Sequence, residues 1–233
     1  MARRPSSTQA ETAVRRRSGV RTLSRERIAA AALEIAEREG LDAVSMRRLA
    51  RELAVGPMTL YRYFRSKDEL IDAAVDAAAQ EVEVNVGGGP WKQELRKLMR
   101  AVRETLERHP VGIRLRLTRP ILSHGALRIT EAGMEILAGA GFDRAGAARA
   151  YRALFVYTFG FASFGSPDHP EDIKRHTQAA LIALPPDEYP MLSAAASEAA
   201  ETMAGEAQFE FGLDRLLDGL EAELQRERPA RSR

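Results

Sequence analysis

The chain has 233 residues, of which 45% are hydrophobic and 29% charged, a composition typical of a folded domain with its own core. It contains no cysteine, which excludes disulfide scaffolds, thiolate metal centres and cysteine nucleophiles. No apolar run approaches the roughly 18–20 residues of a membrane span. The basic N-terminal segment is not followed by the apolar stretch of a secretory signal. We therefore expect a cytoplasmic protein without membrane association.

Charge is distributed unevenly along the chain. The formal net charge is +2, yet residues 1–67 hold 15 Arg and Lys against 7 Asp and Glu, and the remainder holds 20 against 26. The excess of positive charge at the N-terminal end suggests a polyanion partner there, such as nucleic acid. The alternative is a basic tail that only aids solubility.

The N-terminal segment of residues 1–22 carries six arginines without an apolar period, so we expect it to be disordered. The arginines at 15–17 fit either an arm along a DNA duplex or its minor groove, or simply an unstructured terminus. Order is expected from Leu23. Ser24 is the predicted N-cap of a first helix, and Gly40 is its stop signal.

Two short helices joined by a tight turn follow. Ser45 is the candidate N-cap of one, which ends near Ala54, and Pro57 starts the next at residues 57–63, because proline is pre-organised for the first helical position. Such a pair is a helix-turn-helix, whose second helix enters the DNA major groove. The spacing points Met58, Thr59 and Tyr61 outward and buries Leu49, Leu53, Leu60 and Phe64.

The remainder of the chain also has helical patterns. Ser66 to Glu69 matches a capping box that opens a fourth, longer helix, and the run from Gly87 to Pro90 then breaks the chain. Further helices are predicted at Trp91–Arg108, Val111–Leu117, Ala126–Ala140, Arg144–Phe164, His176–Leu184, Met191–Met203 and Glu206–Arg226, with irregular stretches at Ser166–Glu171 and Leu184–Pro190. The predicted fold class is all-α.

The segment Ala50–Leu70, with Gly56-Pro57-Met58-Thr59-Leu60-Tyr61 at its centre, resembles the DNA-binding signature of the TetR family of bacterial transcriptional regulators. In the body, Leu117–Pro120 resembles the Thr-Arg-Pro turn of the tetracycline-repressor branch of that family. Phe209–Leu213 and Gly219–Glu221 resemble the final dimerisation helix of the same branch. The resemblance runs from about Leu23 to Leu224.

This resemblance implies a homodimer that binds a palindromic double-stranded DNA operator and is released by a small-molecule effector. It implies a helix-turn-helix domain at residues 23–69 and a larger helical effector-binding and dimerisation domain at residues 70–228. The two recognition helices must reach successive major grooves about 34 Å apart, so an effector that favours another spacing lowers DNA affinity. A repressor is the expected type of regulator, although activation also fits the sequence.

The resemblance assigns DNA contacts to Ser45, Arg47, Pro57, Met58, Thr59, Tyr61, Tyr63 and Lys67. Arg47 would read a base, because arginine is the commonest bidentate partner of guanine; the alternative is an exposed arginine paired with a neighbour. Pro57, Met58 and Thr59 fall at base-edge positions, and the tyrosines and Lys67 at phosphate contacts. Met58 and Tyr63 have a partly buried place in the core as their alternative, and Ser45 also caps its helix.

The effector pocket is implied to lie in the body. Leu115 and about Glu83 occupy the positions of two ligand-contacting histidines of the tetracycline-repressor branch, so a magnesium–tetracycline ligand is not expected. Tyr151, Phe155 and Thr158 share a helix face, and with Thr118 they are candidate lining residues for an apolar, drug-like or metabolite ligand. The alternative for these aromatic residues is an ordinary core or dimer seam.

No metal or cofactor is expected. His169 and His176 flank Glu171 and Asp172, but the neighbouring prolines indicate a solvated loop rather than a metal site. Near the C-terminus, an apolar stripe comprises Leu213, Leu216, Leu217, Leu220 and Leu224. Together with Gly212 and Gly219 it fits a dimer seam with the helix at 144–164, and equally an intramolecular core helix.

Two other classes of function place different requirements on the sequence. An enzyme is not supported, because Ser163 lies in no Gly-x-Ser-x-Gly motif and the chain lacks a phosphate loop, a zinc motif and a dinucleotide fingerprint. A DNA-binding architectural or constitutive regulator without an effector would fit a body whose pocket is fully packed with side chains.

Overall fold

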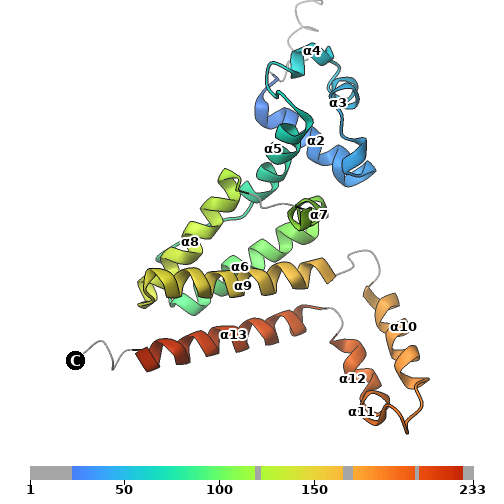
Figure 1. Cartoon of the computed structure of the whole chain (residues 1–233), viewed down its shortest axis with the longest axis vertical. Helices are drawn as coiled ribbons and strands as arrows, with labels where there is room; N and C mark the ends of the chain where they lie inside the picture. Colours follow the sequence, from blue (N-terminus) through green and yellow to red (C-terminus); the bar gives the residue numbers. More distant parts are fainter. Residues whose placement is uncertain (1–22, 119–121, 165–169, 203–204, 228–233) are drawn as a thin grey trace, which may run out of the picture.

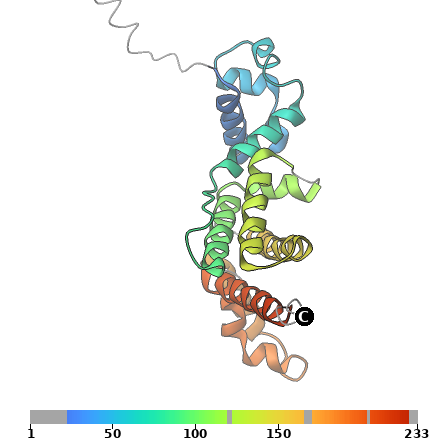
Figure 2. The same ribbon diagram turned by 90° about the vertical axis from the view of Figure 1, so that its left-hand side faces the viewer.

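The computed structural model describes residues 23–118, 122–164, 170–202 and 205–227. Within these ranges the chain is helical and contains no strand, which confirms the all-α fold class. No helix of the described part is both long enough and apolar enough to span a bilayer. The molecule is elongated, with a small N-terminal helical unit at one end of a larger helical body (Figures 1 and 2).

The N-terminal unit, called the head below, comprises α2 (Arg25–Glu39), a 3₁₀ turn η1 (Leu41–Ala43), α3 (Met46–Glu52), α4 (Pro57–Leu60) and the first turns of α5 (Lys67–Gln80). Serine hydroxyls cap three of these helices as predicted. Those of Ser24, Ser45 and Ser66 accept hydrogen bonds from the backbone N–H groups of Arg27, Arg48 and Glu69 at 3.2, 3.1 and 3.1 Å. Each cap satisfies an amide that the helix itself leaves unpaired.

The core of the head is closed. Leu49, Leu60 and Phe64 are fully buried against Ile28 and Ile35 of α2, and Leu53 packs at their edge, as the spacing predicts. Helix α4 is shorter than the predicted 57–63, because residues 61–63 form a turn, after which Phe64 returns to the core.

Helix α5 connects the head to the body. Its buried residues, from Leu70 to Ala78, join the core of the head, and so do Val111 and Leu115 of α7 (Pro110–Thr118). Residue 69, after which the domain boundary is expected, lies in the first turn of α5. The same helix packs against α8 (His124–Ala140), so α5 contacts both the head and the body.

The body is built on α6 (Trp91–Arg108), α8 and α9 (Arg144–Phe164), which pack on one another, and on α13 (Glu206–Glu227), which runs along α9 (Figure 1). Gly133 of α8 makes room for a ring of α9, since a Cβ there would lie 2.4 Å from Cδ2 of Tyr151. Gly212 does the same on α13, where a Cβ would lie 2.1 Å from the hydroxyl oxygen of Tyr157. These two glycines allow the helices to approach closely.

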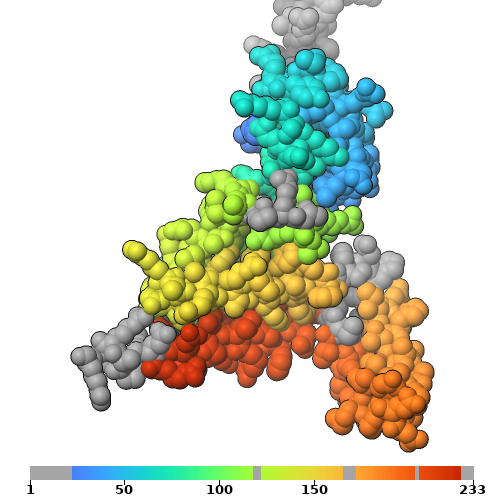
Figure 3. Space-filling model, viewed as in Figure 1, coloured from blue at the N-terminus to red at the C-terminus, as the bar shows by residue number. Residues whose placement is uncertain are grey.

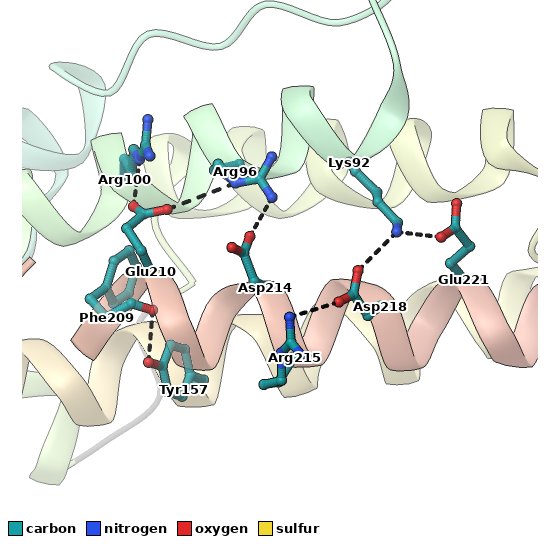
Figure 4. A network of polar contacts seen from close by, with 10 residues as sticks. All are labelled: Lys92, Arg96, Arg100, Tyr157, Phe209, Glu210, Asp214, Arg215, Asp218 and Glu221. Carbon is teal, nitrogen blue, oxygen red and sulfur yellow. Dashed lines mark hydrogen bonds and ion pairs between the residues drawn. The ribbon is translucent and has the colours of Figure 1, made fainter. Parts of the chain in front are cut away.

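Helix α13 is held to its own chain by apolar and ionic contacts. Leu213 and Leu217 are fully buried, so the apolar stripe of this helix serves the intramolecular core. Beside it, basic residues one turn apart on α6 pair with acidic residues on α13 (Figure 4): Lys92 with Asp218 and Glu221, Arg96 with Asp214 and Glu210, and Arg100 with Glu210. Partly exposed pairs of this kind fix register more than they stabilise.

Three helices project from the body as a separate lobe (Figure 3): α10 (Pro170–Ile182), α11 (Pro190–Ala194) and α12 (Ala196–Glu201). The prediction of a helix starting at His176 was wrong, because Pro170 starts it six residues earlier. The single helix predicted at 191–203 is two helices, with a break at Ala195. Of the irregular stretch predicted at 166–171, residues 166–169 lie outside the described ranges, and residues 170 and 171 belong to α10.

Candidate DNA interface and ligand cavity

The outer surface of the helix-turn-helix carries the residues predicted to face DNA. Met58 is 76% exposed at the start of α4, Tyr61 follows it at the surface, and Thr59 and Pro57 complete the same end of the helix. Met58 therefore does not lie in the core, the alternative that the sequence left open. An exposed methionine this large on a four-residue helix is available for contact with thymine methyl groups.

The turn before α4 adopts an unusual backbone conformation. Ala54 has a φ of 54°, in the left-handed region that residues with a Cβ rarely adopt. The N–H of the next residue, Val55, donates to the carbonyl of Ala50 at 2.9 Å and so closes α3. This turn connects α3 to α4. The left-handed conformation of Ala54 was not predicted from the sequence.

Two adjacent arginines on α3 have opposite environments. Arg48 donates to Glu39 and Glu52 at 2.7 and 2.6 Å, and the hydrogen bonds from Arg48 and Arg38 lower the pKa of Glu39 to about 2. Arg47 is exposed, and its side chain makes no hydrogen bond or ion pair with any residue in the described ranges. Arg48 thus fixes the helix, while Arg47 is free to reach a base.

The residues predicted to contact phosphates differ in whether their side chains already make hydrogen bonds within the head. The hydroxyl of Tyr63 donates to the carbonyl of Leu23 at 3.0 Å and its ring packs on the core of the head, which is the alternative that the sequence left open. Lys67 is exposed, with Nζ 3.5 Å from the carbonyl of Asp42, a long contact that a phosphate can displace. The Ser45 hydroxyl accepts the capping bond and keeps its own proton to donate.

The body contains a partly open cavity of about 370 Å³ between α5, α6, α7, α8 and α9. Most of its wall is aliphatic, and polar groups enter at a few points. The lining residues are Val75, Ala78, Ala79, Val82, Val102, Thr105, Leu106, His109, Gly112, Arg116, Leu122, Ala126, Leu127, Ile129, Thr130, Met134, Ala148, Tyr151, Arg152 and Phe155. A mainly apolar wall with few polar groups is typical of sites for small organic ligands.

Only some of the residues predicted to form the effector pocket line this cavity. Tyr151 and Phe155 line the cavity. Thr158 does not, because α9 turns it to the buried face of Leu154, whose carbonyl accepts its hydroxyl at 2.9 Å. The face of Tyr151 and Phe155 continues instead to Phe159, one turn on, with successive ring centroids 6.2 and 5.9 Å apart.

The other three predicted pocket residues lie elsewhere. Leu115 is buried in the core of the head, because α7 turns this side chain towards α2 and α5. Glu83 is exposed beyond the end of α5 and lines a surface groove instead. The side chain of Thr118 lies outside the described ranges.

Tyr151 and Arg116 give the cavity its polar character. The Tyr151 hydroxyl lies 3.3 Å from Thr130 Oγ1, and burial raises its pKa. The guanidinium of Arg116 lies 4.5 Å from the centroid of the Phe155 ring, a cation–π contact. Burial lowers the pKa of Arg116, and the nearby positive charge of Arg152 lowers it further. Neither arginine was predicted to line the cavity. The helical spacing that indicates Tyr151 and Phe155 also places Arg152 beside them, and this was the available signal.

His109 connects the cavity wall to the head. Its Nε2 lies 3.3 Å from Glu81 Oε2, and its Nδ1 lies 3.7 Å from Glu37 Oε1 of α2. His109 Nδ1 and Glu37 Oε1 are buried and have no hydrogen-bond partner within the described part of the chain. Burial raises the pKa of Glu37. A small movement of the wall would therefore bring together or separate two polar atoms that already face each other across the junction.

The described residues contain no group of three or more His, Asp or Glu side chains placed to hold a metal ion. His176 lies on α10 with Nδ1 3.1 Å from the carbonyl of Asp172. His169 and the side chain of Glu171 lie outside the described residues.

Comparison with known proteins decides the family. Residues 28–74 match the model of the bacterial regulatory proteins, tetR family, and residues 85–224 match that of the tetracyclin repressor-like C-terminal domain. The chain belongs to the TetR family. As a TetR-family protein it is a DNA-binding transcriptional regulator and not an enzyme, as the sequence predicts.

Sequence matches to named transcriptional regulators extend over most of the chain. The HTH-type transcriptional repressor DrrR1 of Streptomyces coeruleorubidus is 32% identical over 215 residues, which are 86% of this chain and 78% of DrrR1. The class D tetracycline repressor protein of Escherichia coli is 28% identical over 208 residues, 87% of this chain and 91% of that protein.

Solved structures of the family include complexes with ligand and with DNA. The TetR-family protein ActR of Streptomyces coelicolor, in complex with actinorhodin, has a TM-score of 0.74 at 30% identity and covers 87% of this chain and 99% of its own. BioQ with its double-stranded DNA operator has a TM-score of 0.59 at 27% identity, with 86% and 99% covered.

Proposed function

We propose that this TetR-family regulator represses transcription by binding a palindromic operator as a homodimer, and that a small organic molecule in the α5–α9 cavity releases it. The cavity carries the proposal, because α5 is part of its wall and part of the core of the head. An effector that fits only a shifted arrangement of α5 would change the spacing of the two heads. It would then lower DNA affinity by its differential affinity for the two states.

We assign the roles of the head as follows. Arg47, Pro57, Met58 and Thr59 contact base edges, while Ser45, Tyr61 and Lys67 contact phosphates, with Tyr63 supporting the head from inside. Residues 23–69 act as the DNA-binding unit and residues 70–228 as the effector-binding and dimerisation unit. The protein acts in the cytoplasm, where a bacterial operator is accessible.

A constitutive DNA-binding protein without an effector is the second candidate. It requires a body packed with side chains, and a cavity of about 370 Å³ is within the range of about 300–1,000 Å³ that organic ligands occupy. The named relatives also favour an effector: a structure of ActR holds actinorhodin, and other relatives are tetracycline repressor proteins.

Selection of random DNA duplexes on the purified full-length protein, repeated across a salt series, tests the DNA half of the proposal. We expect a palindromic consensus with half-sites about one helical turn apart and a stoichiometry of two chains per duplex. Weak binding that is blind to sequence and falls steeply with salt would contradict it, because it would leave only contacts with phosphates.

A further inference from the structure

Helix α5 is joined to α8 by two polar contacts near its C-terminal end. The Asp76 carboxylate accepts a hydrogen bond from the backbone N–H of Gly125 at 2.6 Å. In the opposite direction, Nη2 of Arg128 lies 2.8 Å from the carbonyl oxygen of Val82 and 3.3 Å from that of Gln80. The first contact joins α5 to the start of α8, and the second joins α8 to the end of α5. We call this pair of contacts the α5–α8 clamp.

Each contact of the clamp matches the charge of the helix end that it touches. The first N–H groups and the last carbonyls of a helix lack partners within it and carry partial positive and negative charge. Asp76 brings a negative group to the N-terminal end of α8, and Arg128 brings a positive group to the C-terminal end of α5. Burial by itself raises the pKa of the Asp76 carboxyl, but its hydrogen bonds, first among them that from Gly125, outweigh burial and lower the pKa. The carboxylate is therefore charged at neutral pH.

A glycine lets the two helices touch at the clamp. A Cβ at Gly125 would lie 2.9 Å from Cβ of Ala79, well inside the distance of about 3.5–4.0 Å at which carbon atoms pack. Ala79 and Ala126, the residue after Gly125, both line the cavity. A molecule in the cavity therefore meets both helices directly beside the clamp.

Helix α5 runs from the clamp into the head without a break (Figure 1). Its sequence contains no glycine or proline, and Leu70 and Ile71 near its other end are buried in the core of the head. Asp76 lies about 9 Å along the helix axis from Leu70, at about 1.5 Å per residue. A continuous helix of this length moves as one body, so a displacement at the clamp reaches the core of the head.

Two other contacts at this junction are weaker. His109 Nδ1 and Glu37 Oε1 face each other at 3.7 Å, which is too long for a hydrogen bond. Arg108 of α6 pairs at 2.7 Å with Glu81, the residue directly after α5, but both side chains are exposed, and exposed pairs contribute little. The clamp is therefore the stronger attachment of α5 to the body.

We propose that Asp76 and Arg128 are positioning residues that make α5 and α8 move as one unit, so that the head follows the wall of the cavity. The inference rests on the proposed function, in which a molecule in that cavity releases the operator. It goes further by naming the two side chains through which α8 acts on α5. Without them, the helices would keep their apolar packing but would be free to slide and rotate on each other.

The spacing of the two heads in the full-length dimer tests the clamp without any ligand. Because the chain contains no cysteine, Glu34→Cys, exposed on α2, places a single spin label on each head. Double electron–electron resonance then gives the distribution of distances between the two labels. We expect Arg128→Met and Asp76→Asn each to broaden this distribution relative to the labelled parent. Distributions as narrow as that of the parent in both variants overturn the inference.

Matched variants separate the clamp from a general loss of contacts between helices. Arg100→Met and Asp214→Asn each remove a charged group that joins α6 to α13, and should leave the distribution unchanged. Arg128→Lys should also leave it unchanged, because Arg128 reaches its carbonyls with the single nitrogen Nη2 and an ammonium carries three donors on one nitrogen. Asp76→Asn keeps the shape of its side chain, so it tests the inference even if Arg128→Met does not fold. Equal broadening in clamp and α6–α13 variants overturns the inference.

A second measurement asks whether the clamp carries a signal from the cavity. The probe is N-phenyl-1-naphthylamine, a neutral aromatic compound whose fluorescence rises in apolar surroundings, and operator affinity is measured with and without it. We expect Arg128→Met and Asp76→Asn to bind the probe as the parent does. The factor by which the probe weakens operator binding should shrink by at least about twofold in both variants.

The outcomes of this second measurement separate the inference from the proposed function. A factor equal to that of the parent in both clamp variants overturns the inference and leaves release through the cavity in place. If the probe binds the parent without changing operator affinity, release through the cavity is wrong, and the distance distributions alone decide the inference.

Discussion

The head and the body differ in how their apolar side chains pack. In the head, Leu49, Leu60 and Phe64 are fully buried and the helices close over them. In the body, the same kinds of side chain line a partly open cavity of about 370 Å³ between α5 and α9. Side chains on this wall make fewer contacts with one another than those of the head, and an apolar ligand can supply such contacts. The head keeps full packing because the position of a reading helix must be fixed.

The largest expected effect tests the packing of the head with two neighbours on α4. Leu60→Ala removes a fully buried side chain and should lower the free energy of unfolding by about 2–5 kcal/mol. Met58→Ala removes an exposed side chain and should change it by less than about 0.5 kcal/mol, while weakening operator binding. Urea titrations measure the first quantity and fluorescence anisotropy the second. Similar stability losses in the two variants would contradict the assignment of core and reading faces.

The next effect separates the two arginines of α3. Arg47→Ala should cost about 1–3 kcal/mol of operator binding and relax the choice of base at one position. Arg48→Ala removes the same charge from a side chain held by Glu39 and Glu52, and should leave the choice of base intact. Affinities for a set of single-base operator variants measure both. A uniform loss on every sequence in Arg47→Ala would rule out base reading by this residue.

Communication between body and head should depend on Glu37, which faces His109 across the junction. Glu37→Gln should leave unchanged the affinity of the free dimer for an organic cavity ligand selected by thermal-shift screening. The coupling free energy between this ligand and the operator should change by about 0.5–2 kcal/mol. Glu34→Gln, exposed on the same helix, is the matched control. An unchanged coupling factor in Glu37→Gln would remove the pair from the path between the two units.

A smaller effect is expected at Lys67. Lys67→Ala should weaken binding to all sequences alike and reduce the slope of log affinity against log salt by about 0.9, the value for one lost phosphate contact. Lys97→Ala, an exposed lysine on α6 of the body, should leave the slope unchanged. A loss confined to particular base pairs would show that Lys67 acts through bases instead.

The smallest effect concerns the pH dependence of the head. The pKa of Glu39 is lowered from 4.5 to about 2 by bonds from Arg48 and Arg38. Because the folded-state pKa is the lower one, the stabilisation is complete above pH 4.5 and is lost as the pH falls towards 2. Melting temperatures of wild type and Glu39→Gln should therefore converge across this window. A difference that stays constant across it would contradict the role of the Glu39 charge.

The head could be predicted from sequence because its signals are local. Each serine cap lies next to its helix, Pro57 starts α4, and the outward and inward residues of α4 follow from its spacing alone. Sequence could not reveal that Ala54 adopts a left-handed φ or that the Tyr63 hydroxyl bonds to Leu23, 40 residues away. Both depend on how the helices pack.

The cavity could be predicted only in part, because it is made by five helices that meet from distant parts of the chain. Helical spacing found Tyr151 and Phe155 but added Thr158, which the rotation of α9 turns into the core. The resemblance to the tetracycline-repressor branch indicated Leu115, which packs on the head instead. Arg116 on α7 and Arg152 on α9 line the same cavity, and no spacing along the sequence shows that two separate helices bring them to one wall.

Coupling between the cavity and the head can be measured from both sides. The affinity for the same screened cavity ligand is measured with the free dimer and with the dimer on its selected operator, and operator affinity is measured with and without that ligand. We expect the ligand and the operator each to weaken binding of the other by the same factor, about 5–150-fold. A cavity ligand that binds free and operator-bound protein equally would contradict this coupling.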